Sequence, residues 1–240
     1  MHLESAFIST TVGLSMWGLS ATSLGLAVPR IKKDSLPLML SAGAFVFGAQ
    51  MMNYAIPGTG SSGHLVGTVF LTALLGPWAA LSTMAIILWI QCVGFNDGGL
   101  LAYGCNLFNM GIIGCLCGTF LFRKHFSPFK TMLCSVGASI VAVQLGALAV
   151  CGEVAVSGIN SLHLADFIAA MQPIHLALGI GEGLITGMLL VAVQRKAFAW
   201  KPLTATFALA ALVLIFGLSS FASERPDGLE WSIERATLTR

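Results

Sequence analysis

The chain has 240 residues, of which 56% are hydrophobic and only 9% are charged. Soluble domains carry roughly 25% charged residues, so this composition cannot cover a water-facing surface. The formal net charge of +2 and the lack of a basic cluster interleaved with aromatic residues argue against a nucleic-acid-binding protein. The apolar segments are long and unbroken, which favours an all-α integral membrane protein over a membrane barrel.

Apolar segments of about 20 residues predict the membrane-spanning helices, because that length crosses the hydrocarbon core. The clear candidates are 6–28, 36–52, 101–122, 131–151, 174–194 and 203–222. The segment 65–95 is longer and is interrupted at Gly76-Pro77. Its apolar pattern is consistent with one kinked helix or with two short helices.

Basic residues decide between these alternatives, because the positive-inside rule places their clusters in the cytoplasm. The clusters are Arg30/Lys32/Lys33, Arg123/Lys124/Lys130 and Arg195/Lys196/Lys201. An even number of crossings must separate the first two clusters. The segment 65–95 is therefore predicted to form two helices, about 65–75 and 78–95, with Pro77 in the first turn of the second. The predicted fold is a polytopic helical bundle of about seven spans plus one C-terminal span.

The same rule places residue 1 outside the membrane, together with the loops 53–64, 95–100 and 152–173 and the tail after 222. The N-terminus lacks the positive n-region and the small-residue cleavage site of a signal peptide. Met1 is therefore expected to be the mature start of the chain.

The loop NYAIPGTGSSGHLVG, residues 53–67, is rich in glycine and small hydroxyl residues. Such a backbone can approach a ligand closely. His64 carries the only strong ligand atoms of this loop, and Asn53 at its start is a candidate to hydrogen-bond the site. The alternative is an ordinary flexible turn with an incidental histidine.

The stretch FNDGGLLAYGCNLFNMG places polar side chains at the start of a predicted span and inside it. Asp97 precedes two glycines, which is typical of an N-cap or a turn. Asn106 and Asn109 lie three residues apart and are predicted to share a helix face. Amides inside a span usually serve packing or hydrogen-bond other ligands, so we favour that role over direct metal ligation.

The stretch MQPIHLALGIGEGLITG contains His175 and Glu182. Glu182 is predicted to lie inside a span, where a carboxylate is costly and indicates a function by default. It is expected to line the site, to pair with another span or to face a partner subunit, and a structural or partner role is favoured over metal ligation. Gly179, Gly181 and Gly183 would allow another helix to approach closely.

The opening MHLES holds the donors of a metal chelate. The Met1 amine, the His2 amide nitrogen and the His2 Nδ1 atom can reach one ion and close a five-membered and a six-membered ring. His64 can add a fourth nitrogen from a different external loop. Four nitrogens in a plane suit Ni(II), Cu(II) and Co(II) better than Zn(II), which prefers a tetrahedron. The alternative is that His2 is an interfacial residue by chance.

Four separated stretches, MHL, PGTGSSGHLVG, FNDGGLLAYGCNLFNMG and IHLALGIGEGLITG, together resemble the CbiM/NikM family. This family comprises the substrate-capture subunits of energy-coupling-factor transporters for cobalt and nickel. The resemblance covers residues 1–195. It implies a helical bundle with its N-terminus in an external pocket, and a metal ion bound by Met1, His2 and His64. The ion, Ni(II) or Co(II), would be transported cargo, and no prosthetic group is expected.

The element PDGLE, residues 226–230, resembles the small N-type accessory subunit of these systems. The chain is therefore expected to combine a metal-capture membrane domain, 1–196, with an accessory segment, 197–240. That segment would hold one span and an external tail. Such a fusion is nearer to the nickel-type arrangement.

The resemblance also implies partner proteins. No G-x-x-x-x-G-K-[ST] motif is present, so the chain is not expected to be an enzyme that hydrolyses ATP. The implied partners are a transmembrane coupling protein of the CbiQ/NikQ type and two ATPase subunits of the CbiO/NikO type. The implied location is the plasma (inner) membrane of a bacterium, with the N-terminus external and the basic loops cytoplasmic.

Two other functions compete with metal uptake. One is a metal-binding sensor or structural membrane protein without transport. The other, less favoured, is a membrane-embedded metalloenzyme that uses His64, His175 and Glu182, although the sequence shows no nucleophile with an adjacent base.

Overall fold

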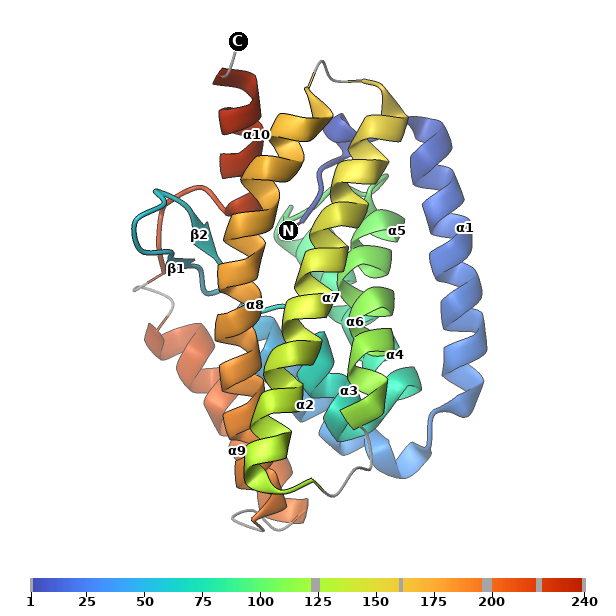
Figure 1. Cartoon of the computed structure of the whole chain (residues 1–240). Coiled ribbons are helices and arrows are strands. Elements are labelled where there is room, and N and C mark those ends of the chain that lie inside the picture. The colour runs from blue at the N-terminus through green and yellow to red at the C-terminus, as the bar shows by residue number, and fades with distance from the viewer. Residues whose placement is uncertain (1, 122–125, 160–161, 196–199, 219–221, 239–240) are drawn as a thin grey trace.

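The computed structural model describes residues 2–121, 126–159, 162–195, 200–218 and 222–238. Within these ranges the chain forms an elongated bundle of helices with one short hairpin (Figure 1). The helices are α1 (Thr10–Ala27), α2 (Leu36–Gln50), α3 (Thr68–Leu75), α4 (Pro77–Gly94), α5 (Tyr103–Asn106), α6 (Ile113–Gly118), α7 (Pro128–Ser157), α8 (Leu164–Gln194), α9 (Trp200–Leu212) and α10 (Gly228–Leu238). The strands β1 (Tyr54–Ala55) and β2 (Ser62–Gly63) pair antiparallel.

The described chain contains five stretches that are long and apolar enough to cross a membrane. They are Thr10–Arg30, Pro77–Gly94, Tyr103–Leu121, Pro128–Ser157 and Leu164–Gln194. These helices confirm the predicted all-α membrane fold. The predicted number of spans stays a prediction, because α2, α3 and the segment Leu203–Gly217 are shorter than a full crossing.

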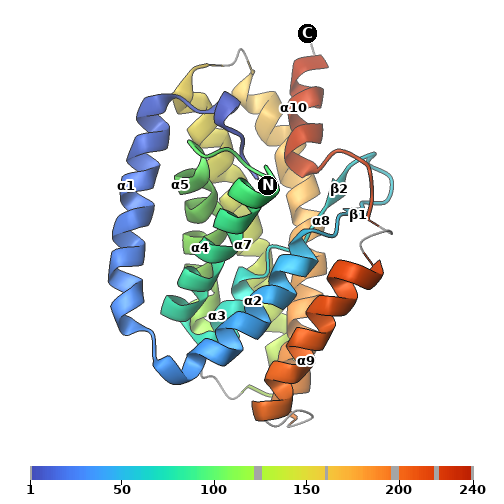
Figure 2. The same cartoon turned by 180° about the vertical axis from the view of Figure 1, so that it is seen from behind.

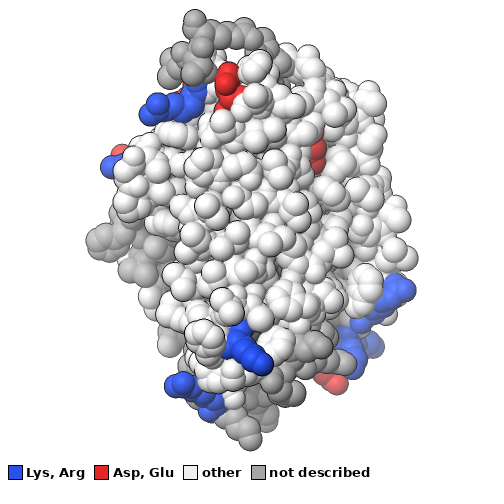
Figure 3. Space-filling view, viewed as in Figure 1, with Lys and Arg blue, Asp and Glu red and all other residues white. Residues whose placement is uncertain are grey.

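The outer surface of the bundle is apolar. Leu40 is 73% exposed, Leu116 72% and Phe216 80%. Figure 3 shows a broad uncharged band between charged groups at the two ends of the molecule. The C-terminal end of α1, the start of α7 and the end of α8, which border the predicted basic clusters, lie at the same end of the bundle (Figure 1). This distribution suits a protein surrounded by lipid.

The segment 65–95 forms two helices, α3 and α4, as predicted. Gly76 separates them with φ +85° and ψ 162°, a backbone conformation that essentially only glycine adopts. Its N–H still closes α3 by donating to the Thr72 carbonyl at 2.9 Å. Pro77 then begins α4, at the position where a missing N–H costs nothing.

Two helices are longer than predicted. α7 continues to Ser157 and α8 begins at Leu164, so most of the predicted external loop 152–173 is helical. Asp166 lies in the first turn of α8, where a negative charge favours the helix dipole, and pairs with His163 at 3.1 Å. The prediction was too short because apolar length counts only the residues inside the hydrocarbon core.

Glycines bring α8 close to α7. A Cβ atom at Gly179 would lie 2.8 Å from the Ile140 Cα atom, and one at Gly183 would overlap the Val136 backbone. Gly181 points elsewhere, because its nearest neighbour is the Tyr54 hydroxyl at 3.7 Å. Gly179 and Gly183 therefore serve the predicted helix contact, and Gly181 does not.

The C-terminal segment folds back onto the bundle. α9 packs along α2, where the ring centroids of Phe207 and Phe45 lie 5.4 Å apart. α10 then lies beside α8 (Figure 2). A Cβ atom at Gly228 would lie 2.9 Å from Ile174, so glycine permits this contact. The predicted external tail after 222 is thus largely helical and is packed against the membrane domain.

Candidate metal-binding site

The N-terminal segment is held inside the protein by Asn106. Its Oδ1 atom accepts from the Leu3 N–H at 2.8 Å, and its Nδ2 atom donates to the Leu3 carbonyl at 3.0 Å. The Gly99 N–H donates to the same carbonyl at 3.0 Å. Leu3 is completely buried. The amide therefore pairs with the backbone of the segment as a neighbouring strand would, and this fixes the position of His2.

The two glycines after Asp97 allow the N-terminal segment to pack closely against the chain. Gly98 has φ +87°, and a Cβ atom there would lie 2.8 Å from Asn106 Nδ2. A Cβ atom at Gly99 would overlap the backbone of Ser5. The chain after these glycines adds one more bond, from the Leu101 N–H to Ser5 Oγ at 3.1 Å. The Asp-Gly-Gly motif thus works as a docking turn for the N-terminal segment.

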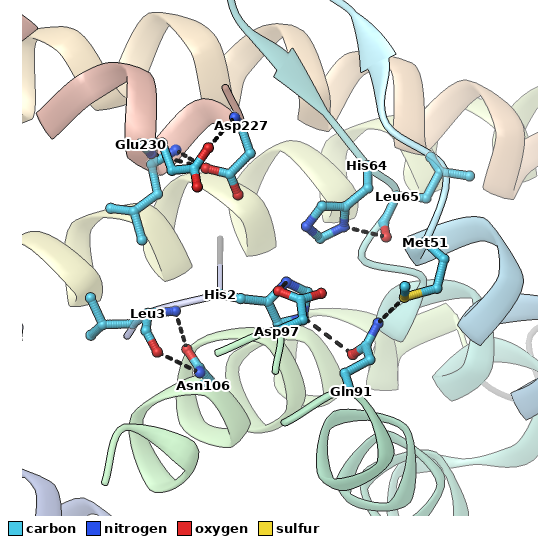
Figure 4. A network of polar contacts seen from close by, with 11 residues as sticks. His2, Leu3, Met51, His64, Leu65, Gln91, Asp97, Asn106, Asp227 and Glu230 are labelled. Carbon is cyan, nitrogen blue, oxygen red and sulfur yellow. Dashed lines mark hydrogen bonds and ion pairs between the residues drawn. The ribbon is translucent and has the colours of Figure 1, made fainter. Parts of the chain in front are cut away.

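The His2 ring is buried between polar groups. Its Nε2 atom lies 3.2 Å from Gln91 Oε1, and its Nδ1 atom lies 3.2 Å from Asp97 Oδ1. The ring stacks on that of His64, with centroids 4.9 Å apart and planes inclined by 24°. Figure 4 shows these side chains converging from the N-terminal segment, α4 and the loops.

His64 reaches the same place from the loop between β2 and α3. Its Nδ1 atom donates to the Leu65 carbonyl at 3.1 Å, so Nε2 keeps a lone pair. Glu182 of α8 fixes the following turn by accepting from the Val66 N–H at 2.8 Å and the Gly67 N–H at 3.1 Å. Charge-assisted bonds of this kind are among the stronger ones. Glu182 therefore orients the loop that carries His64.

Burial controls the charge of this cluster. It lowers the pKa of His2 to about 3 and that of His64 to about 3, because a buried imidazolium loses its hydration. Both rings are neutral at pH 7, which is the form that binds metals. Burial raises the pKa of Asp97. It would also raise the pKa of Asp227, but nearby positive charge and the Glu230 N–H outweigh burial and leave that pKa below its usual range.

The PDGLE segment closes this region. The Ser62 N–H donates to the Pro226 carbonyl at 2.8 Å, and Ser62 Oγ donates to the Arg225 carbonyl at 2.7 Å. Asp227 caps α10 by accepting from the N–H groups of Leu229 and Glu230 at 2.8 and 2.9 Å. It also lines a small cavity together with His64. The accessory segment thus extends the hairpin and brings a carboxylate to the site.

The other predicted residues are dispersed. Met1 lies outside the described residues. Asn53 accepts from the Ser223 N–H at 2.8 Å through its backbone carbonyl. Asn109 donates to Glu153 at 2.7 Å, away from the N-terminal segment. Asn106 and Asn109 therefore bind different partners, and the π-helical segment Leu107–Ile112, which begins between them, departs from the regular α-helix on which the prediction of a shared face was based.

Sequence reasoning missed three polar residues. Gln91 contacts His2, Asp227 lies near His64, and Glu153 binds Asn109. Gln91 and Glu153 are polar residues in apolar helices, the same signal that identified Asn106 and Glu182. Asp227 carried a signal only as part of the PDGLE motif, because its proximity to His64 depends on the return of the C-terminal segment.

The donor set defines what this site can bind. Among the described residues, no group of three or more His, Cys, Asp and Glu side chains could hold a metal ion by itself. His2 and His64 supply two neutral imidazoles at one place. A metal ion bound here therefore needs ligands besides these side chains, and backbone nitrogen donors would suit Ni(II) and Cu(II).

Comparisons with known proteins match both parts of the chain. Residues 2–200 match the family CbiM, cobalt uptake substrate-specific transmembrane region, and residues 201–240 match the PDGLE domain. The chain is 30% identical over 233 residues to the "Putative fused nickel transport protein NikMN" of Archaeoglobus fulgidus. The aligned region covers 93% of this chain and 78% of that protein. It is 29% identical over 206 residues to the cobalt transport protein CbiM of Streptococcus sanguinis, with 79% and 82% covered.

A solved structure has the same fold. The crystal structure of a truncated transition metal transporter aligns with a TM-score of 0.71 at 30% sequence identity, covering 81% of this chain and 99% of that one. The chain therefore belongs to the CbiM family of cobalt uptake substrate-specific transmembrane regions and carries a PDGLE domain at residues 201–240.

Proposed function

We propose that this protein is the metal-capturing membrane subunit of a nickel or cobalt uptake transporter. The ion would be held by four nitrogens: the Met1 amine, the His2 amide, His2 Nδ1 and His64 Nε2, together called the N-terminal chelate below. The observation that carries this proposal is the buried pair of neutral imidazoles, His2 and His64, stacked 4.9 Å apart.

The contacts of the two rings support the choice of nitrogen atoms. When His2 Nε2 donates to Gln91 Oε1, and the Asp97 carboxyl 3.2 Å from Nδ1 holds the proton between them, the lone pair of the ring lies on Nδ1. Nδ1 is the atom that closes a six-membered ring with the amide nitrogen of the same residue. His64 Nδ1 donates to the Leu65 carbonyl, so the lone pair of that ring lies on Nε2. Such outer hydrogen bonds set the tautomer and direction of metal-binding histidines.

The charge of the site supports a divalent cation. The ligating amide loses its proton on metal binding and so contributes one negative charge. Asp97 contacts His2, and Asp227 faces the cavity beside His64, which adds carboxylates around the ion. Names of relatives include both nickel and cobalt transport, and a planar set of nitrogens is compatible with either metal.

Transport would require partner proteins. We propose a transmembrane coupling protein of the CbiQ/NikQ type and two ATPases of the CbiO/NikO type, with the chelate at the external face. The helix ends that border the basic clusters lie together at one end of the bundle, and the start of α8 lies at the other end. This supports an orientation with the basic clusters in the cytoplasm. The membrane would be the inner membrane of a bacterium. A sensor or structural protein would bind metal equally well without driving uptake.

The proposal is tested by Ni(II) and Co(II) titration of detergent-purified protein, with and without two residues added before Met1. The extension keeps both histidines but moves the free amine. Binding that collapses on extension supports the chelate, and unchanged affinity overturns it. Uptake into vesicles containing the complete transporter then separates a transport subunit from a sensor.

A further inference from the structure

A basic pocket lies where the turn after α1 leads into α2 and where α4 begins. Its volume is about 340 Å³. Arg30 and Lys32 line it, and none of the described residues that line it is acidic. The Arg30 guanidinium lies over the Trp78 ring, 4.9 Å from its centroid, and also donates to the Leu26 carbonyl. These two contacts hold one positive charge in a fixed place at the pocket.

Helix ends add to the electrostatic potential of this pocket. α2 and α4 both begin here, after Ser35 and Gly76, and neither start is capped by a side chain. A helix N-terminus presents free N–H groups and a partial positive charge. α3 ends at Leu75 beside the same pocket, which offsets part of that charge. Arg30 and Lys32 therefore decide the sign, and the pocket suits an anionic group such as a phosphate.

An apolar groove continues from this pocket between α2 and α4, which pack against each other (Figure 2). Its volume is about 280 Å³. Ser35 of the pocket precedes Leu36 of the groove, and Ala79 of the pocket lies one helical turn before Thr83 of the groove. The pocket and the groove are therefore two parts of one surface, charged at one end and apolar along the rest.

The groove has the length of one lipid leaflet. From Leu36 to Phe47, α2 rises by roughly 16 Å at about 1.5 Å per residue. A leaflet supplies half of a hydrocarbon core that is about 30 Å thick. Thr83 is the one polar side chain among the described residues of the lining, and its hydroxyl donates to the Ala79 carbonyl of its own helix. The groove thus offers an apolar wall of the right length for an acyl chain.

We propose that the pocket and the groove bind one anionic phospholipid, with its phosphate beside Arg30 and Lys32 and one acyl chain between α2 and α4. This combined surface is called the lipid site below. Basic pockets between membrane helices on the cytoplasmic side bind anionic headgroups. Trp78 fits this depth, since tryptophan is enriched at the membrane–water interface. The leaflet is the cytoplasmic one in the proposed orientation, whereas lipid binding itself does not depend on metal transport.

The first experiment compares two lipids by native mass spectrometry of the full chain, purified and delipidated in detergent. The probes are phosphatidylglycerol, which is anionic, and phosphatidylcholine with the same acyl chains, which is zwitterionic. We expect one phosphatidylglycerol per chain, retained about tenfold more strongly than phosphatidylcholine. Equal retention of the two lipids overturns the lipid site, and this comparison needs no substitution.

The second experiment locates the headgroup by removing charge. The double variant Arg30→Gln/Lys32→Gln should weaken phosphatidylglycerol retention about tenfold and leave that of phosphatidylcholine unchanged. The matched control is Lys130→Gln/Arg195→Gln, which removes two exposed basic residues at the start of α7 and the end of α8, outside the pocket. Circular dichroism checks that both proteins are folded. An equal loss in the two double variants would indicate attraction by overall charge and would overturn the lipid site.

The third experiment fills the groove. Ala44 is exposed and lines the groove, so Ala44→Phe should place a ring where the acyl chain lies and lower phosphatidylglycerol retention about tenfold. Ala208→Phe, at an exposed alanine of α9, is the control and should bind lipid normally. Unchanged retention in the Ala44 variant overturns the lipid site, because a free phosphate in the pocket would not need the groove. If that variant also fails to assemble with the coupling protein, the groove belongs to a partner helix instead.

Discussion

His2 and His64 stack with ring centroids 4.9 Å apart, although one precedes the first span and the other follows the second helix of the bundle. Each ring is positioned by a different buried polar group. His2 depends on Asn106 and Gln91, and the loop of His64 depends on Glu182. The site is thus assembled from side chains that lie inside apolar helices, and each of these can be tested.

Replacing His64 by alanine should weaken Ni(II) binding by about 100-fold, which corresponds to about 2.8 kcal/mol. The reason is the loss of one of four ligands from an otherwise preformed site. Isothermal titration calorimetry of the purified protein measures this directly. His163→Ala should bind normally, because His163 is exposed and pairs with Asp166 at the start of α8. Equal affinities of the two variants would remove His64 from the ligand set.

Gln91→Leu should lower metal affinity by about 10- to 100-fold, the usual effect of losing an outer hydrogen bond to a ligating histidine. Leucine keeps the volume of the side chain but cannot accept from His2 Nε2. Gln91→Glu keeps an acceptor and should bind more tightly than Gln91→Leu. If both variants behaved alike, the orientation of His2 would not depend on this contact.

Asn106→Leu should release the N-terminal segment, because it removes two hydrogen bonds of about 1 kcal/mol each and leaves the Leu3 N–H unpaired. We expect faster hydrogen exchange at Leu3 and weaker Ni(II) binding, while the helices stay folded. Asn53→Ala is the matched control, since the contact of Asn53 with Ser223 uses its backbone carbonyl. Unchanged hydrogen exchange at Leu3 in the Asn106 variant would show that Asn106 does not hold the N-terminal segment.

Glu182→Gln should weaken Ni(II) binding less than Glu182→Ala. Glutamine retains one acceptor oxygen for the N–H groups of Val66 and Gly67, whereas alanine leaves both without an acceptor in a buried turn. Thermal unfolding in detergent should follow the same order. A Glu182→Ala protein with normal affinity and stability would show that the loop of His64 is held by other contacts.

Much of the membrane architecture could be predicted from apolar length and charge. The break at Gly76-Pro77 was predicted because an even number of crossings was needed, and Gly76 adopts the positive φ that separates α3 from α4. The lengths of α7 and α8 were underestimated, since about 20 residues suffice to cross the hydrocarbon core and both helices continue well past that length. The π-helical segment that contains Asn109 was not predicted, because it cannot be recognised from spacing.

Covalent chemistry and composition by themselves determined that this chain is a helical membrane protein and predicted Met1 and His2 as candidate chelators of a metal ion. These properties depend on residue identity and on neighbours in the chain. Only the tertiary structure decided that Gln91, Asp97 and Asp227 gather around His2 and His64, because those contacts join helices and loops far apart in sequence. The partner of a buried polar group is set by which helix packs beside it, and no local pattern encodes that choice.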